Sequence, residues 1–110
     1  MALTYVLLAL AIVAEVVGTI CLRLSEGFTR LIPSLAVVAG YAIAFTLLAV
    51  VLKRGLPVAV AYAIWAGAGV ALVAAVGVVF LDERLSVAQV VGICLVIAGV
   101  VALEVGGAEV

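Results

Sequence analysis

Four apolar runs, each long enough to cross a lipid bilayer, take up most of this sequence. A transmembrane helix needs about 20 apolar residues, each adding 1.5 Å of rise. The runs are too long for ordinary strands, and they lack the strict alternation of a half-buried strand. We therefore predict an all-α membrane protein, one domain over 1–110, with transmembrane helices at about 2–22, 31–52, 56–81 and 85–103.

Composition supports a membrane protein over a soluble one. Of the 110 residues 71% are hydrophobic, whereas soluble chains are about half apolar. The first run lacks the basic start and the cleavage site of a signal peptide, so we interpret it as a span. The connections RLSEGFTR, KRG and DER are short, which makes consecutive helices antiparallel neighbours. Pro33 and Pro57 are expected in the first turn of the helix that follows each of them.

The same composition argues against several function classes. A net charge of -1 gives no indication of nucleic-acid binding, and the chain contains no histidine. Cys21 and Cys94 both lie in apolar stretches, where small core residues are the expected interpretation. No phosphate loop, metal-ligand cluster or nucleophile–base pair is visible. We expect no enzyme activity, no cofactor and no metal.

Glu15 is the one charged side chain well inside an apolar run. A carboxylate at that depth costs about 2.5–3.5 kcal/mol on insertion scales. The other three runs contain no Lys or Arg that would neutralise it. A proton or a cation from outside the chain is then the expected partner, which makes ion or cation transport the first hypothesis.

Basic residues are almost evenly divided between the two sides of the membrane. The first and third connections share one side and hold Arg23, Arg30 and Arg84, whereas the second holds Lys53 and Arg54. Orientation normally follows the excess of Lys and Arg on the cytoplasmic side. With three against two, we expect insertion in both orientations, which permits an antiparallel pair. The alternative is that a single basic residue suffices to orient the chain.

Small residues and aromatics suggest what surrounds the carboxylate. Gly18 and Thr19 follow Glu15 by three and four residues, on its helix face. They leave room for another helix or a ligand, and Thr19 has a hydroxyl to donate, although ordinary packing explains small residues equally well. Tyr62 and Trp65 are three apart in the third run, which fits either a site for a lipophilic cation or plain packing.

Glycine pairs mark two further places. Gly67 and Gly69 permit a kink in the third helix, of the kind that transporters use to alternate, or close helix packing. Gly92 and Gly99 lie seven residues apart on the fourth helix, and this spacing indicates a small-residue dimer seam.

The segments AEVVGTICLRLSEGFTRLIPS, the GY pair of the second run and AYAIWAGAG of the third resemble the small multidrug resistance family. The resemblance covers nearly the whole chain, and its motifs are specific. It implies a proton-coupled exporter of cationic compounds, multi-pass in the bacterial inner membrane and in contact with its lipid. It also implies an antiparallel homodimer of four-helix subunits.

The resemblance assigns roles to individual residues. Glu15 is implied to bind proton and substrate in turn. The residues implied to line the substrate chamber are Trp65, Tyr62, Tyr41, Tyr5, Thr19 and Gly18. The implied third-helix hinge is Gly67 and Gly69, and the implied fourth-helix dimer seam is Gly92 and Gly99.

Two alternatives stay open at this point. Members that export guanidinium usually have a Trp three residues after the Glu, whereas Gly18 and Tyr41 match the quaternary-ammonium, multidrug type. A different class is a non-transporting, proton-binding proteolipid or assembly subunit. Such rotor subunits usually have two helices and place the carboxylate in the second, whereas this chain has four runs and Glu15 in the first.

Overall fold

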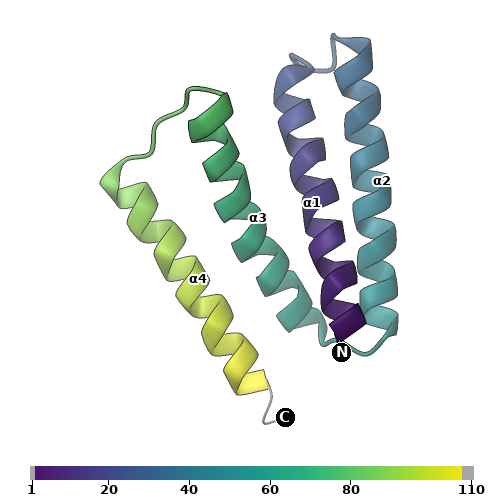
Figure 1. Cartoon of the computed structure of the whole chain (residues 1–110), viewed down its shortest axis with the longest axis vertical. Helices are drawn as coiled ribbons and strands as arrows, with labels where there is room; N and C mark the ends of the chain where they lie inside the picture. Colours follow the sequence, from purple (N-terminus) through teal and green to yellow (C-terminus); the bar gives the residue numbers. More distant parts are fainter. Residues whose placement is uncertain (1, 108–110) are drawn as a thin grey trace. The chain divides into compact units, whose positions relative to one another are not determined.

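The computed structural model describes residues 2–107, and the secondary structure in that range is helical. Four long helices follow one another along the chain: α1 (Ala2–Leu24), α2 (Leu31–Lys53), α3 (Val58–Phe80) and α4 (Val87–Gly107) (Figure 1). Each is long and apolar enough to cross a membrane. The predicted all-α class and the four membrane-spanning helices are confirmed.

The ends of α3 and α4 differ from the predicted limits. Pro57 does not lie in the first turn of α3 but precedes it, in an extended conformation with φ −57° and ψ 141°. Helix α4 starts at Val87 rather than near 85 and continues to Gly107, so Glu104 lies within its last turn. The late start has a local cause. The Ser86 backbone N–H donates to Gln89 Oε1 over 2.8 Å, and the Gln89 N–H donates to Ser86 Oγ over 3.1 Å. This reciprocal pair is a capping box, which fixes a helix start.

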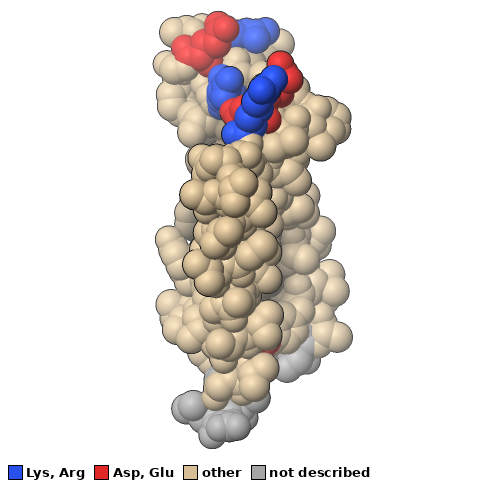
Figure 2. All heavy atoms as spheres, turned by 90° about the vertical axis from the view of Figure 1, so that its left-hand side faces the viewer, with Lys and Arg blue, Asp and Glu red and all other residues tan. Residues whose placement is uncertain are grey.

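The described chain falls into two compact units, Met1–Leu56 and Pro57–Val110. Each unit is a hairpin of two antiparallel helices, α1 with α2 and α3 with α4 (Figure 1). In Figure 2 the helical length that faces the viewer is almost uncharged between its ends. An uncharged length of this kind suits a hydrocarbon environment, where a charged side chain is costly.

Ser25 organises the connection between α1 and α2. Its side chain is fully buried; Oγ donates to the Leu22 carbonyl over 2.7 Å and accepts from the Phe28 N–H over 3.1 Å. The next three residues all have positive φ: Glu26 at 50°, Gly27 at 75° and Phe28 at 66°. Only glycine adopts this region without cost. Glu26 and Phe28 are not glycine and disfavour this backbone conformation. The hydrogen bonds of Ser25 therefore stabilise the turn despite them.

The opposite end of the first hairpin is tied by a side-chain hydrogen bond. Arg54 Nε donates to Thr4 Oγ1 over 2.9 Å, and Thr4 is buried at the start of α1. Between the two ends, the buried positions of α2 are Val37, Gly40, Ala44 and Val51. Their spacing of three, four and seven residues is that of one narrow helix face. The first unit is thus a hairpin secured at both ends and closely packed between them.

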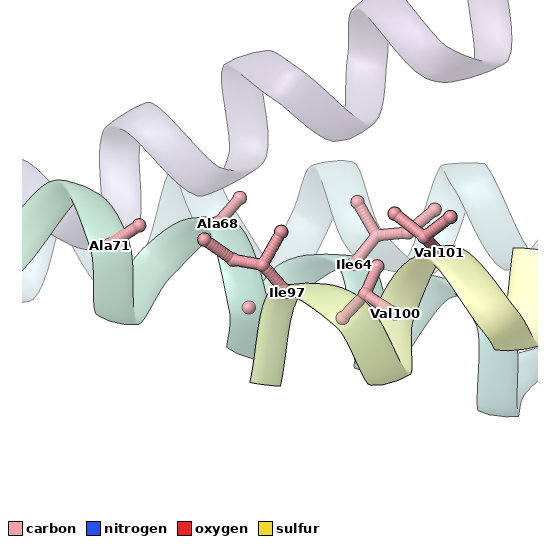
Figure 3. Close-up of a pocket in the computed structure, with 7 residues that line it drawn as sticks. Ile64, Ala68, Ala71, Ile97, Val100 and Val101 are labelled. Atoms are coloured by element: carbon pink, nitrogen blue, oxygen red, sulfur yellow. The ribbon is translucent and has the colours of Figure 1, made fainter. Parts of the chain in front are cut away.

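The second unit is more open. Helix α4 has no buried residue among those described, whereas the buried residues of α3 are Ala61, Trp65, Gly67, Gly69 and Gly77. An apolar groove of about 200 Å³ runs between the two helices. Figure 3 shows Ile64, Ala68 and Ala71 of α3 on one side of it and Ile97, Val100 and Val101 of α4 on the other. The two helices of this unit leave space that their own side chains do not fill.

Candidate functional site

Glu15 lies midway along α1 and is half-buried. The other charged residues within described helices, Arg23, Lys53 and Glu104, all lie in the last turn of their helix. Glu15 is therefore the one charge among residues 2–107 that lies far from either end of a helix. No group of three His, Cys, Asp or Glu side chains in that range is placed to hold a metal ion.

A chain of two hydrogen bonds reaches Glu15 from the neighbouring helix. Thr19 Oγ1 donates to Glu15 Oε1 over 3.0 Å, one helical turn away on α1. The same hydroxyl oxygen lies 2.8 Å from the hydroxyl of Tyr41 on α2. The structure thus brings together three of the predicted site residues, all within the first unit.

The number of protons available determines which group donates in each of these two hydrogen bonds. An ionised carboxylate only accepts hydrogen bonds, and a hydroxyl has one proton to donate. With Thr19 donating to Glu15, the bond between Thr19 and Tyr41 must be donated by the Tyr41 hydroxyl. Both donors then point toward the negative charge. Hydrogen bonds to an ionised group are roughly twice as strong as those between neutral groups, and both hydroxyls are placed to make such bonds.

Gly18 makes the room that Tyr41 needs. A Cβ atom added at Gly18 would lie 3.0 Å from Cδ1 and 3.1 Å from Cε1 of the Tyr41 ring. The ring therefore packs directly on the backbone of α1. The small residue at position 18 thus admits an aromatic ring of α2 within the same chain.

Two residues of this neighbourhood, Gly40 and Phe45, were not predicted from the sequence. A Cβ atom at Gly40 would lie 3.0 Å from the Ala14 carbonyl oxygen and 3.1 Å from Gly18 Cα, so the two helices cross almost backbone to backbone. Phe45, one turn beyond Tyr41, meets the Tyr41 ring edge-on, with ring centroids 6.5 Å apart at 69°. The GY pair entered the sequence analysis only as part of the family motif, because a glycine in an apolar helix does not by itself indicate which backbone faces it.

Tyr5 is not part of this cluster. It precedes Glu15 by ten residues on the same straight helix, which places it about 15 Å away along the axis at 1.5 Å per residue. Its side chain is exposed. Any role of Tyr5 at the substrate requires a different location from the hydrogen-bonded chain around Glu15.

Tyr62 and Trp65 belong to α3, in the second unit. Their spacing places them on neighbouring positions of one helix, yet Tyr62 is 64% exposed whereas Trp65 is 9% exposed. The two rings therefore face different surroundings within the single chain. Their proposed joint role at the substrate remains a prediction.

The two glycine pairs differ in their surroundings. A Cβ atom at Gly67 would lie 2.7 Å from Val100 Cγ2 of α4, and α3 passes through Gly67 and Gly69 as an unbroken helix. This contact favours the packing interpretation of Gly67. At Gly92 and Gly99, by contrast, an added Cβ would meet nothing within 4 Å. The fourth-helix pair therefore has no packing contact within the described part of the second unit.

Comparison with known proteins adds independent information. Residues 3–96 match the model of the family described as Small Multidrug Resistance protein. The multidrug resistance protein mmr of Mycobacterium leprae is 49% identical over 107 residues, covering 97% of this chain and 100% of that protein. The quaternary ammonium compound-resistance protein QacF of Klebsiella aerogenes is 45% identical over 100 residues, covering 91% and 90%. A multidrug transporter of Pseudomonas aeruginosa is 47% identical, with the same coverage.

Proposed function

The chain belongs to the Small Multidrug Resistance protein family, and from this premise we propose that it is a proton-coupled antiporter that exports lipophilic and quaternary ammonium cations. Its family is one of transporters and not of enzymes, and the chain is a multi-pass membrane protein with four spans. The relatives named above are bacterial, and we infer the inner membrane as its location.

The observation that carries the proposal is the setting of Glu15. It is an acceptor within a membrane-spanning helix, reached by two hydroxyl donors, and no cationic side chain of the same span lies nearer than the last turn. A carboxylate so placed is neutralised by a proton or by a bound cation. Because both compete for the same charge, occupation by one displaces the other, and a proton gradient then drives cation export.

We infer that the working form is an antiparallel homodimer. The near balance of basic residues, three against two, permits both orientations in one membrane. In such a dimer two copies of Glu15 share one chamber and titrate as a coupled pair. Tyr62 and Trp65 supply aromatic faces for the cation. Gly92 and Gly99 form the seam, which their open surroundings support.

The substrate class follows from relatives and from the residues around Glu15. The printed names of relatives refer to multidrug resistance and to quaternary ammonium compounds. Gly18 admits the Tyr41 ring beside Glu15, whereas a Trp at that position, as in the guanidinium type, would occupy the same space. A quaternary ammonium ion has no proton to donate, so its recognition depends on charge and on aromatic faces rather than on hydrogen bonds.

The proposal is tested in liposomes that contain the purified protein and carry a proton gradient. Uphill movement of tetrabutylammonium is expected for the wild type and is expected to be lost in Glu15→Gln, because an amide cannot exchange a proton for a cation. Glu26→Gln is the matched control, since Glu26 is an exposed carboxylate in the connection after α1. Uphill transport by the Glu15→Gln protein would overturn the proposed mechanism.

A further inference from the structure

The crossing of α1 and α2 is the tightest approach beside the hydrogen-bonded chain. Gly40 immediately precedes Tyr41, and its added Cβ would press on the Ala14 carbonyl oxygen at 3.0 Å and on Gly18 N at 3.3 Å. These are backbone atoms of α1, which no side-chain rotation can move aside. The absence of a side chain at Gly40 therefore sets the distance between the two helix axes at this point.

That distance determines whether Tyr41 reaches Thr19. The Tyr41 ring packs on Gly18, and its hydroxyl ends 2.8 Å from Thr19 Oγ1. The ring and the hydroxyl are both carried by α2, one residue after the crossing. An outward shift of α2 by a few tenths of an ångström lengthens this bond directly, while the bond from Thr19 to Glu15 lies within α1 and is unaffected.

We propose that Gly40 is a positioning residue, which sets the closeness of α1 and α2 so that the Tyr41 hydroxyl reaches Thr19 and, through it, the Glu15 carboxyl. The proposal rests on the proposed function, since it assigns Gly40 an effect on the exchange of proton for cation. Gly40 touches neither the substrate nor the reacting carboxylate. It acts through the helix separation alone.

The hydrogen bonds from Tyr41 to Thr19 and from Thr19 to Glu15 differ between the ionised and the protonated state of Glu15. With the carboxylate ionised, both hydroxyls donate toward it. When the carboxyl takes up a proton it gains a donor of its own, and the direction of both bonds can reverse. Because hydrogen bonds to the ionised group are the stronger ones, losing the Tyr41 hydroxyl disfavours the ionised form. Cation binding, which needs that form, then requires a higher pH.

Few other groups can produce such an effect in this unit. Helix α2 carries no charged side chain between Leu31 and Leu52, and Tyr41 is its one titratable residue in that range. On α1 the remaining titratable side chains are Tyr5, Cys21 and Arg23, which lie from nearly two to nearly three turns away from Glu15. In the proposed dimer the second copy of Glu15 also affects the pH dependence, so a Tyr41→Phe background is needed to isolate the effect of the Tyr41 hydroxyl.

The test is a double-mutant cycle on tetrabutylammonium binding, measured by calorimetry over a range of pH. Gly40→Val is expected to weaken binding about tenfold and to raise the midpoint pH by about one unit, the scale of one lost hydrogen bond to a charged group. Gly40→Ala should give a smaller change in the same direction. In a Tyr41→Phe background neither substitution should change the midpoint further, because the hydroxyl through which Gly40 acts is already absent.

Ala39→Val is the matched control, because it adds the same side chain beside Gly40 on α2 at an exposed position. It should leave the midpoint unchanged. If Gly40→Val does not yield folded protein, the Gly40→Ala pair decides the outcome alone. An unchanged midpoint in Gly40→Ala, or an equal shift with and without the Tyr41 hydroxyl, would overturn the proposal. A wild-type protein that releases no proton on binding would instead overturn the proposed function, so the two failures are distinguishable.

Discussion

The two helical hairpins of this chain differ in how closely their two helices are held together. The α1–α2 hairpin is tied by Ser25 at one end and by the Arg54–Thr4 bond at the other, with a glycine crossing between them. The α3–α4 hairpin has an apolar groove, and α4 buries none of its described residues. Within lipid, close packing and hydrogen bonds hold helices together, because burial from lipid gives little hydrophobic gain. The first hairpin is therefore the more closely packed of the two, and the second has the more exposed helix.

The largest expected effect concerns the open surface of the second hairpin. Gly92→Leu or Gly99→Leu adds a bulky side chain where nothing of the same chain lies within 4 Å. The single chain should still fold, whereas close contact with a second copy should be lost. We expect monomers in mild detergent and no transport. Size analysis beside substrate flux measures both, and dimeric, active variants would show that the seam lies elsewhere.

Gly67→Leu separates packing within the chain from contact between chains. Its new side chain would overlap Val100, so it should open the α3–α4 hairpin itself. We expect dimers to persist with slower transport and with lower stability to denaturing detergent. Val100→Ala should partly restore the stability of Gly67→Leu by making room. A hinge role without packing predicts slower transport with unchanged stability, and this result would contradict the contact.

Insertion in both orientations is the next expected effect. A C-terminal reporter should appear on both sides of the membrane in the wild type. Two lysines inserted after Gly55 should hold that connection in the cytoplasm and leave one orientation dominant. Transport should then fall and return when the oppositely oriented chain is supplied. A wild-type reporter found on one side alone would exclude the antiparallel homodimer.

A moderate effect is expected at Trp65. Trp65→Ala should weaken the binding of ethidium by about 1–2 kcal/mol, the scale of a desolvated cation–π contact, and Trp65→Phe should cost less. Phe80→Ala, which removes an exposed ring at the end of α3, serves as the control. Unchanged binding in the Ala variant would assign Trp65 to packing within the second hairpin.

The sequence predicted the helices well and the contacts between them poorly. Long apolar runs determine spans, because length and hydropathy suffice for them, and a lone carboxylate stands out within such a run. The role of Gly40 was not foreseen, since a glycine in an apolar helix does not reveal which backbone faces it. Pro57 was misplaced because proline suits both the first turn and the position before it. The Ser86–Gln89 capping box was missed although its S-x-x-Q pattern was readable. The role of Ser25 in the turn after α1 was also missed.

The smallest expected effect is that of Ser86→Ala in the second hairpin, which is compared with Ser25→Ala in the first. Ser25→Ala removes a buried hydroxyl that accepts from the Phe28 N–H, and this loss leaves a strained left-handed turn without its support. Ser86→Ala removes an exposed cap whose backbone groups water can satisfy. We expect a loss of about 1–3 kcal/mol for Ser25→Ala, the scale for a buried group left unsatisfied. Ser86→Ala should lose about 1 kcal/mol or less, toward the lower end for a helix cap.

Unfolding by denaturing detergent measures both losses of stability. Ser34→Ala is the control, because it removes an exposed hydroxyl that is bonded within its own helix end. Equal losses at Ser25 and Ser86 would show that the first hairpin gains no special stability from its connection, and the contrast between the two hairpins would then rest on the glycine crossing alone.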